Sequence, residues 1–120
     1  MPTAQSRGTV FPVNSCPGNI SEIVYASKRL NCSGIDKFEN TYHCLPSSDL
    51  SQLVELCYHT SFLIENRNCM VLQSGYLNNR SCLHFTEGCP SKHYQSKLML
   101  EFPACTKINK QKRCYLADPT

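Results

Sequence analysis

The sequence of 120 residues lacks the short motifs by which many small enzymes are recognised. It has no G-x-S-x-G nucleophile elbow, no H-E-x-x-H zinc motif and no phosphate-binding loop. It also has no Cys-Cys pair and no His-Asp step, both of which secreted phospholipases use. These absences leave no residue to which a catalytic role can be assigned. We therefore expect a protein that is not an enzyme and that has no cofactor.

Long apolar runs are also missing. The sequence has no stretch of 18 apolar residues, so we expect no membrane-spanning segment in this chain. Near the start, Val10, Phe11 and Val13 are too few to form the apolar centre of a signal peptide, and Pro12 interrupts them. We expect a flexible leader at residues 1–15 and one domain at residues 16–120, in either a processed ectodomain or a fragment.

Cysteine is the residue type that the sequence has in excess, with nine in the chain. This content is typical of a disulfide scaffold in a secreted or cell-surface protein. Zinc sites need ligands two to four residues apart, and the absence of any C-x-x-C leads us to expect no bound metal. Pairing eight of nine cysteines allows roughly 945 arrangements, so the spacing does not define the connectivity. With Cys114 as the ninth, the disulfide candidates are Cys16, Cys32, Cys44, Cys57, Cys69, Cys82, Cys89 and Cys105.

Three N-x-[ST] motifs begin at Asn19, Asn31 and Asn79. Each could be an ordinary Asn/Ser turn, but three of them in a chain with this cysteine content indicate N-glycosylation. The motifs and the cysteines together predict an extracellular glycoprotein, either secreted or part of a cell-surface ectodomain.

Positive charge is concentrated near the end of the sequence. Up to Thr106 the eight basic residues balance the eight acidic ones, and Lys107, Lys110, Lys112 and Arg113 supply the excess. Such a patch could meet a heparin-like polysaccharide, a nucleic acid or an anionic lipid. Because the patch is small and no aromatic residue interleaves with it, we favour a solvated loop and expect no nucleic-acid partner.

The histidines raise the alternative of a soluble secreted effector. His43 directly precedes a cysteine, and His59 and His84 each lie two residues after one, which would suit a metal only if those thiols were free. Two imidazoles in a basic secreted chain could also cleave RNA as acid and base. The effector alternatives are thus a basic nuclease, a toxin- or inhibitor-like module and a hormone-like module.

Two segments have the apolar spacing of helices. The first, residues 19–32, begins with Asn19 and Glu22 in a capping-box pattern, a role that would compete with a glycan on Asn19. The second, residues 47–60, has apolar residues at 50, 53, 54 and 57 after a cap at Ser48 or Asp49. A short third helix is predicted with Ser96 as its cap, and Pro103 is expected to end it.

The remaining segments predict strands and turns. Residues 37–46 read as extended, residues 68–79 as a hairpin around Ser74-Gly75, and residues 85–90 as a turn. We therefore predict an α+β fold, a small disulfide-rich domain with two or three short helices and a small antiparallel sheet. The alternative is a mostly helical cysteine-rich domain. In either fold, disulfides substitute for the large core that a short chain cannot build.

Four short motifs together suggest a family. They are Y-x-C-L-P, G-C-P, F-P-A-C and C-Y-x-A-D-P, at residues 42–46, 88–90, 102–105 and 114–119. In this order the chain resembles, from Cys16 to Pro119, a cysteine-rich ectodomain of uncharacterised single-pass membrane proteins in bivalve molluscs. In that family the last motif continues to a further cysteine, followed by a Ser/Thr-rich stalk and one membrane-spanning helix.

The resemblance implies a domain of ten cysteines, in which Cys114 would pair with a cysteine directly after Thr120. We therefore expect Cys114 to be unpaired in this chain and available for a disulfide-linked dimer; the alternative is that Cys114 is paired and another cysteine is spare. The resemblance implies a location and an architecture but no binding residue. We expect a non-enzymatic extracellular interaction domain that presents a rigid surface to an unknown protein or glycan partner.

Overall fold

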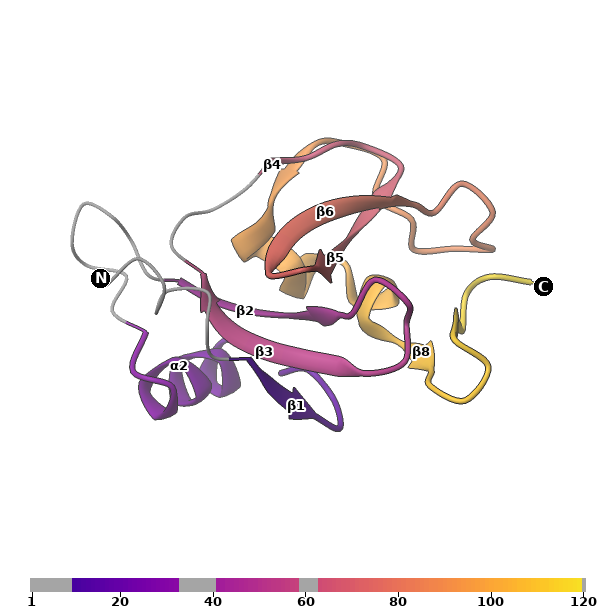
Figure 1. Cartoon of the computed structure of the whole chain (residues 1–120). Coiled ribbons are helices and arrows are strands. Elements are labelled where there is room, and N and C mark those ends of the chain that lie inside the picture. The colour runs from indigo at the N-terminus through magenta and orange to yellow at the C-terminus, as the bar shows by residue number, and fades with distance from the viewer. Residues whose placement is uncertain (1–9, 33–40, 59–62, 120) are drawn as a thin grey trace.

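A central antiparallel sheet organises the chain (Figure 1). The computed structural model describes residues 10–32, 41–58 and 63–119. The strands lie in the order β1-β3-β2, with bounds Phe11–Val13 for β1, Thr41–Pro46 for β2 and Leu53–Tyr58 for β3. Residues 11–13 fall within the expected leader, and they pair with β3. The extended segment predicted before Pro46 is confirmed as β2.

Helix α2 (Ile20–Arg29) confirms the first predicted helix. The Asn19 Oδ1 accepts the backbone N–H of Glu22 at 2.9 Å, and the Glu22 carboxylate accepts that of Gly18 at 2.7 Å. At the other end, Asn31 adopts φ 64°, and Cys32 N–H donates to the Ser27 carbonyl at 2.8 Å. This is a Schellman motif, in which an asparagine takes the left-handed position that glycine usually fills.

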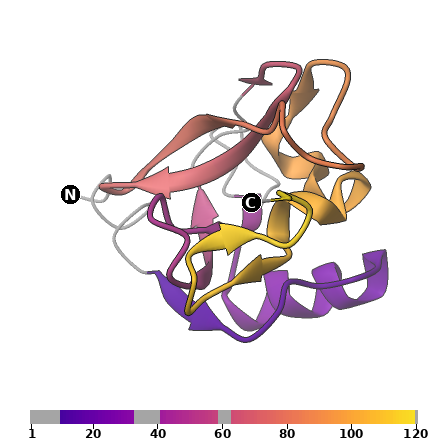
Figure 2. The same cartoon turned by 90° about the vertical axis from the view of Figure 1, so that its right-hand side faces the viewer.

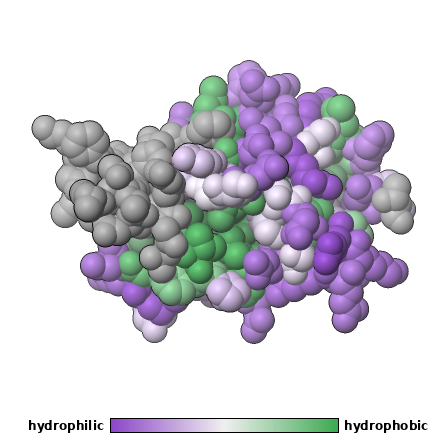
Figure 3. Space-filling model, in the orientation of Figure 1, coloured by the Kyte–Doolittle hydropathy of each residue, from purple (hydrophilic) through white to green (hydrophobic). Residues whose placement is uncertain are grey.

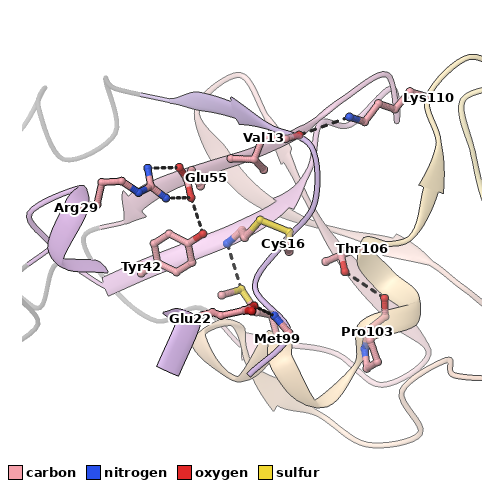
Figure 4. Close-up of a disulfide and its surroundings, with 12 residues drawn as sticks. Val13, Cys16, Glu22, Arg29, Tyr42, Glu55, Met99, Pro103, Thr106 and Lys110 are labelled. Carbon is pink, nitrogen blue, oxygen red and sulfur yellow. Dashed lines mark hydrogen bonds and ion pairs between the residues drawn. A yellow bond between two sulfur atoms is a disulfide. The ribbon is translucent and has the colours of Figure 1, made fainter. Parts of the chain in front are cut away.

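The helix lies against one face of the sheet and is linked covalently to it at both ends. Figure 4 shows the first of these bonds, at Cys16. Cys16 precedes the helix and bonds to Cys44 on β2, while Cys32 follows it and bonds to Cys57 on β3. Strand residues alternate between faces, so the two strand cysteines point to the same side. The sequence separations of 28 and 25 residues show that both bonds close long loops.

Between these two bonds a buried carboxylate joins helix and sheet. Glu55 on β3 is 3% exposed, and Arg29 donates to both of its oxygens at 2.9 and 3.1 Å. The Tyr42 hydroxyl adds a third hydrogen bond at 2.6 Å. Burial raises the pKa of Glu55, but the hydrogen bonds and the charge of Arg29 outweigh it and hold that pKa below its usual value. Glu55 is therefore ionised and fully partnered.

The other face of the sheet packs against the second half of the chain, as Figure 1 shows. Here β5 (Asn68–Gln73) and β6 (Tyr76–Ser81) form the predicted hairpin, with Ser74 and Gly75 at φ 53° and 85°. Positive φ at both turn positions is what a two-residue hairpin requires. The other elements are short: β4 (Leu63–Ile64), β7 (Tyr94–Gln95), η2 (Ser96–Glu101), η3 (Pro103–Thr106), β8 (Ile108–Asn109) and β9 (Cys114–Tyr115).

The second predicted helix, at residues 47–60, is wrong, because its core forms strand β3. The expected cap Asp49 instead accepts the N–H of Ser51 two residues on, and Leu50 at φ 59° ends any helical path. Strand β3 lies between β1 and β2 with both faces covered, so nearly all of its residues are buried. A continuous run of apolar residues contains the i, i+3, i+4, i+7 spacing of a helix, so spacing alone does not distinguish a fully buried strand from a helix.

The third predicted helix is present, but as a 3-10 helix, and it ends before Pro103 as expected. Residues 96–106 form two 3-10 helices, and the cap of the first is Gln95 rather than Ser96. Pro103 starts the second of them, where its missing N–H costs nothing. The predicted α+β class is confirmed: a small domain with four disulfides, one main helix and several small antiparallel sheets in its described residues.

One histidine is part of the core. The His43 ring is fully buried, with Nδ1 3.0 Å from the Thr41 carbonyl and Nε2 2.7 Å from the Ser96 hydroxyl. A neutral ring satisfies both contacts, since Nδ1–H donates to the carbonyl and Nε2 accepts from the hydroxyl. Burial lowers the pKa of His43 to about 4.

This environment predicts a loss of stability in mild acid. Because the unfolded chain binds the proton more readily, the contribution of His43 is complete above about pH 6.5 and is lost as the pH falls towards 4. We expect the free energy of unfolding to fall by up to about 3 kcal/mol over that range. Denaturant titrations at pH 7, 5.5 and 4.5 would measure it. In His43→Gln the free energy of unfolding should fall less between pH 7 and 4.5 than in the parent chain, whereas the exposed His84→Gln should behave like the parent. An equal fall in His43→Gln and in the parent chain would contradict this.

Candidate functional site

All eight cysteines predicted to form disulfides do so. The bonds are Cys16–Cys44, Cys32–Cys57, Cys69–Cys105 and Cys82–Cys89. Cys114 on β9 is half-buried and unpaired, as expected. Four disulfides indicate an oxidising compartment. Within the described residues no helix is long and apolar enough to cross a bilayer.

The second half of the chain forms an open groove of about 700 Å³. Its walls come from three segments, residues 86–91, 101–104 and 116–117, together with Lys107. The apolar part of the lining includes Pro90, Phe102 and Leu116, and the charged part comprises Glu87, Glu101 and Lys107. The volume lies within the range of ligand-binding clefts.

Disulfides and backbone hydrogen bonds fix the walls of this groove. Cys82–Cys89 closes the loop that carries the first wall, and Cys69–Cys105 anchors η3 beside the second. The Thr86 N–H donates to the Ala117 carbonyl at 2.8 Å, which joins the first wall to the third. The Leu116 N–H donates to the Lys107 carbonyl at 2.9 Å. The groove is therefore preformed.

Gly88 allows the first two walls to meet. It adopts φ +88°, and a Cβ added there would lie 2.6 Å from the Ala104 Cβ. No side chain fits at that distance, so the close approach of the two segments depends on glycine.

A second, smaller groove of about 220 Å³ lies between helix α2 and the sheet. Arg29, Tyr42 and Glu55 line it, and their polar groups are occupied with one another. Burial, together with the hydrogen bond to Glu55, raises the pKa of Tyr42, so its hydroxyl stays protonated. This cluster serves to hold the helix on the sheet.

The three glycosylation candidates occupy different settings. Asn19 and Asn31 are exposed at the two ends of helix α2, whereas Asn79 is half-buried on β6 and accepts the Glu65 N–H at 3.1 Å. The cap at Asn19 uses Oδ1, whereas an N-glycan is attached to the side-chain nitrogen. The expected competition between cap and glycan is therefore removed, since the two roles use different atoms.

The basic residues Lys107, Lys110, Lys112 and Arg113 are all exposed on the β8–β9 hairpin. Of the histidines, His43 is buried, His84 is exposed, and His59 lies outside the described residues. Across the described part of the chain, no group of three His, Cys, Asp or Glu side chains is placed to hold a metal ion.

The sequence does not predict the groove, although several of its residues belong to the short motifs described above. Three of the four short motifs, at residues 88–90, 102–105 and 114–119, contribute to its walls. Eleven residues lie between the first and second of these motifs and eight between the second and third, and only the tertiary fold brings them together. Comparison with family models, with curated proteins and with solved structures finds no match for this chain.

The close approach at Gly88 predicts the effect of adding one methyl group. Gly88→Ala should lower the free energy of unfolding by about 2 to 4 kcal/mol, because it combines a disfavoured positive φ with a clash at Ala104. Gly75→Ala is the matched control, since Gly75 has φ +85° and nothing within 4 Å. It should cost only about 1 kcal/mol. Equal costs in denaturant titrations would contradict the packing at Gly88.

Proposed function

We propose that this chain is a non-enzymatic extracellular interaction domain of a receptor-like or secreted protein, and that it binds a segment of a protein partner in the groove. The observation that carries this proposal is the groove itself, a preformed cleft whose walls are cross-linked by disulfides. The oxidising compartment indicated by the four disulfides supports an extracellular location.

The lining of the groove suits a protein ligand. Protein interfaces usually combine apolar contacts, which supply affinity, with charges, which set orientation, and the groove offers both. Phe102 and Leu116 offer apolar contacts, and Glu87 and Lys107 offer charges of opposite sign. An extended peptide with an apolar anchor and a charged neighbour fits this pattern.

The rigidity of the walls supports the same conclusion. Loops that are ordered before binding lose little conformational entropy when the ligand arrives, so more of the contact energy appears as affinity. In this groove the ordering is covalent at Cys89 and Cys105, both of which lie in or beside a wall.

Cys114 offers a route by which two copies of this chain could form a dimer. An odd cysteine in an oxidising compartment tends to bridge to a second chain, and Cys114 is half-buried rather than enclosed. A disulfide-linked dimer through Cys114 would place two grooves on one molecule. Cys114→Ser should then run as a monomer on a non-reducing gel on which the parent chain is a dimer. A dimer band that persists in the variant would contradict this.

The groove can be tested with one substitution in its wall. Peptides selected from a display library against the whole chain should lose about tenfold or more in affinity for Leu116→Asp, because an apolar contact is replaced by a charge. Leu83→Asp is the control, since Leu83 is also 63% exposed and does not line the groove. Calorimetry with the selected peptides gives the three dissociation constants.

Two results would contradict the proposal. One is that no peptide is selected, or that Leu116→Asp and Leu83→Asp bind equally well. The other is cleavage of RNA between about pH 5 and 8 that is lost when His59 and His84 are replaced, since that would establish the nuclease alternative.

A further inference from the structure

The β8–β9 hairpin presents its charges on an ordered turn. Ile108 pairs with Tyr115 and Asn109 with Cys114, which leaves a four-residue loop, residues 110–113. The Asn109 Oδ1 accepts the N–H groups of Gln111 and Lys112 at 3.0 and 2.9 Å. The Asn109 carbonyl accepts the Arg113 N–H at 2.7 Å, with Arg113 at φ 56°. Three hydrogen bonds to one asparagine thus hold the loop in a single conformation.

The loop is strongly cationic and faces solvent. Lys110, Lys112 and Arg113 are exposed, and the sequence from Phe102 to Ala117 contains no acidic residue. Figure 2 shows the hairpin tip beside β1, where the Lys110 ammonium lies 3.5 Å from the Val13 carbonyl. In Figure 3 strongly hydrophilic residues gather at the lower right, over the region of β8.

A further cation adjoins the loop across the surface. The Arg80 guanidinium on β6 donates to the Ser48 carbonyl at 3.2 Å. Arg113 is close enough to Asp49, the residue after Ser48, for its charge to help lower the pKa of that carboxylate. Both arginines therefore lie beside the turn at residues 47–51. We define the basic face as Arg80, Lys110, Lys112 and Arg113, of which none lines the groove.

Asp49 opposes this charge. Hydrogen bonds from the Ser51 hydroxyl, the Ser47 hydroxyl and the Ser51 N–H, with a smaller effect of Arg113, lower the pKa of Asp49 to about 2. The carboxylate is therefore ionised at any physiological pH. Removing its charge should strengthen the attraction of the basic face for an anion.

We propose that the basic face is a binding site for a sulfated polysaccharide, independent of the groove. The ligand class follows from the chemistry of the surface. Ordered, exposed cations without acidic residues in the loop suit a linear polyanion, because each contact releases counterions from the polymer. Residues 107–114 contain no aromatic side chain on which unpaired bases could stack. The loop tip also lacks apolar side chains that would insert into a membrane.

A pair of charge-matched variants of the whole chain tests the proposal. A heparin dodecasaccharide should bind the triple variant Lys110→Gln, Lys112→Gln, Arg113→Gln about tenfold or more weakly than the parent chain. The control triple variant Arg67→Gln, Lys92→Gln, Lys97→Gln loses the same charge at other exposed positions and should change the affinity less than about threefold. Equal losses in the two variants would overturn the proposal, because binding would then follow net charge alone.

Asp49→Asn gives the opposite expectation. The asparagine Oδ1 can still accept the three hydrogen bonds, so the turn is kept while the negative charge is removed. Heparin affinity should rise about twofold to fivefold at low salt. An unchanged or lower affinity would overturn the proposal, as would tighter binding to single-stranded RNA or to anionic vesicles of equal charge concentration. Leu116→Gln changes the groove wall without adding a charge, so it should weaken binding of the selected peptides and leave heparin binding unchanged. This variant separates a failure here from a failure of the groove.

Discussion

The covalent attachment of helix α2 to the sheet is the constraint on which the first half of the structure depends. Cys16–Cys44 and Cys32–Cys57 bracket the helix, and each closes a loop long enough to remove roughly 3 to 4 kcal/mol of unfolded-state entropy. A ten-residue helix would be marginal alone in water. Once it is fixed, Arg29 covers the buried carboxylate of Glu55, which would otherwise be a costly unpaired charge in the centre of the sheet.

The second half of the chain uses the same principle for a different purpose. Its strands are mostly two residues long, so regular structure cannot order the intervening loops. Cys69–Cys105 and Cys82–Cys89 order them instead, and Gly88 permits their close approach. The result is a groove with fixed walls and, on the neighbouring hairpin, a fixed set of cations. A ligand that binds at either feature would meet ordered loops, so that little conformational entropy would be lost on binding.

The sequence predicts those parts of the fold that local signals control. Asn19 and Glu22 mark the start of helix α2, Ser74-Gly75 marks a hairpin, and the cysteine content indicates a disulfide scaffold. It fails at β3, because a strand buried on both faces has no alternation and its preceding Asp49 resembles a helix cap while forming a turn. The groove has no local signal at all, since tertiary packing brings its three walls together. The connectivity of the disulfides likewise depends on the fold rather than on spacing.

The fold depends most directly on its covalent framework, and a peptide map of the protein expressed in an oxidising compartment tests this framework. Digestion without reduction, after alkylation of free thiols and followed by mass spectrometry, should recover the four bonds Cys16–Cys44, Cys32–Cys57, Cys69–Cys105 and Cys82–Cys89. Cys114 should be found either alkylated or bridged to Cys114 of a second chain. A different pairing would contradict the fixed groove, and several alkylated cysteines would contradict the oxidising compartment as well.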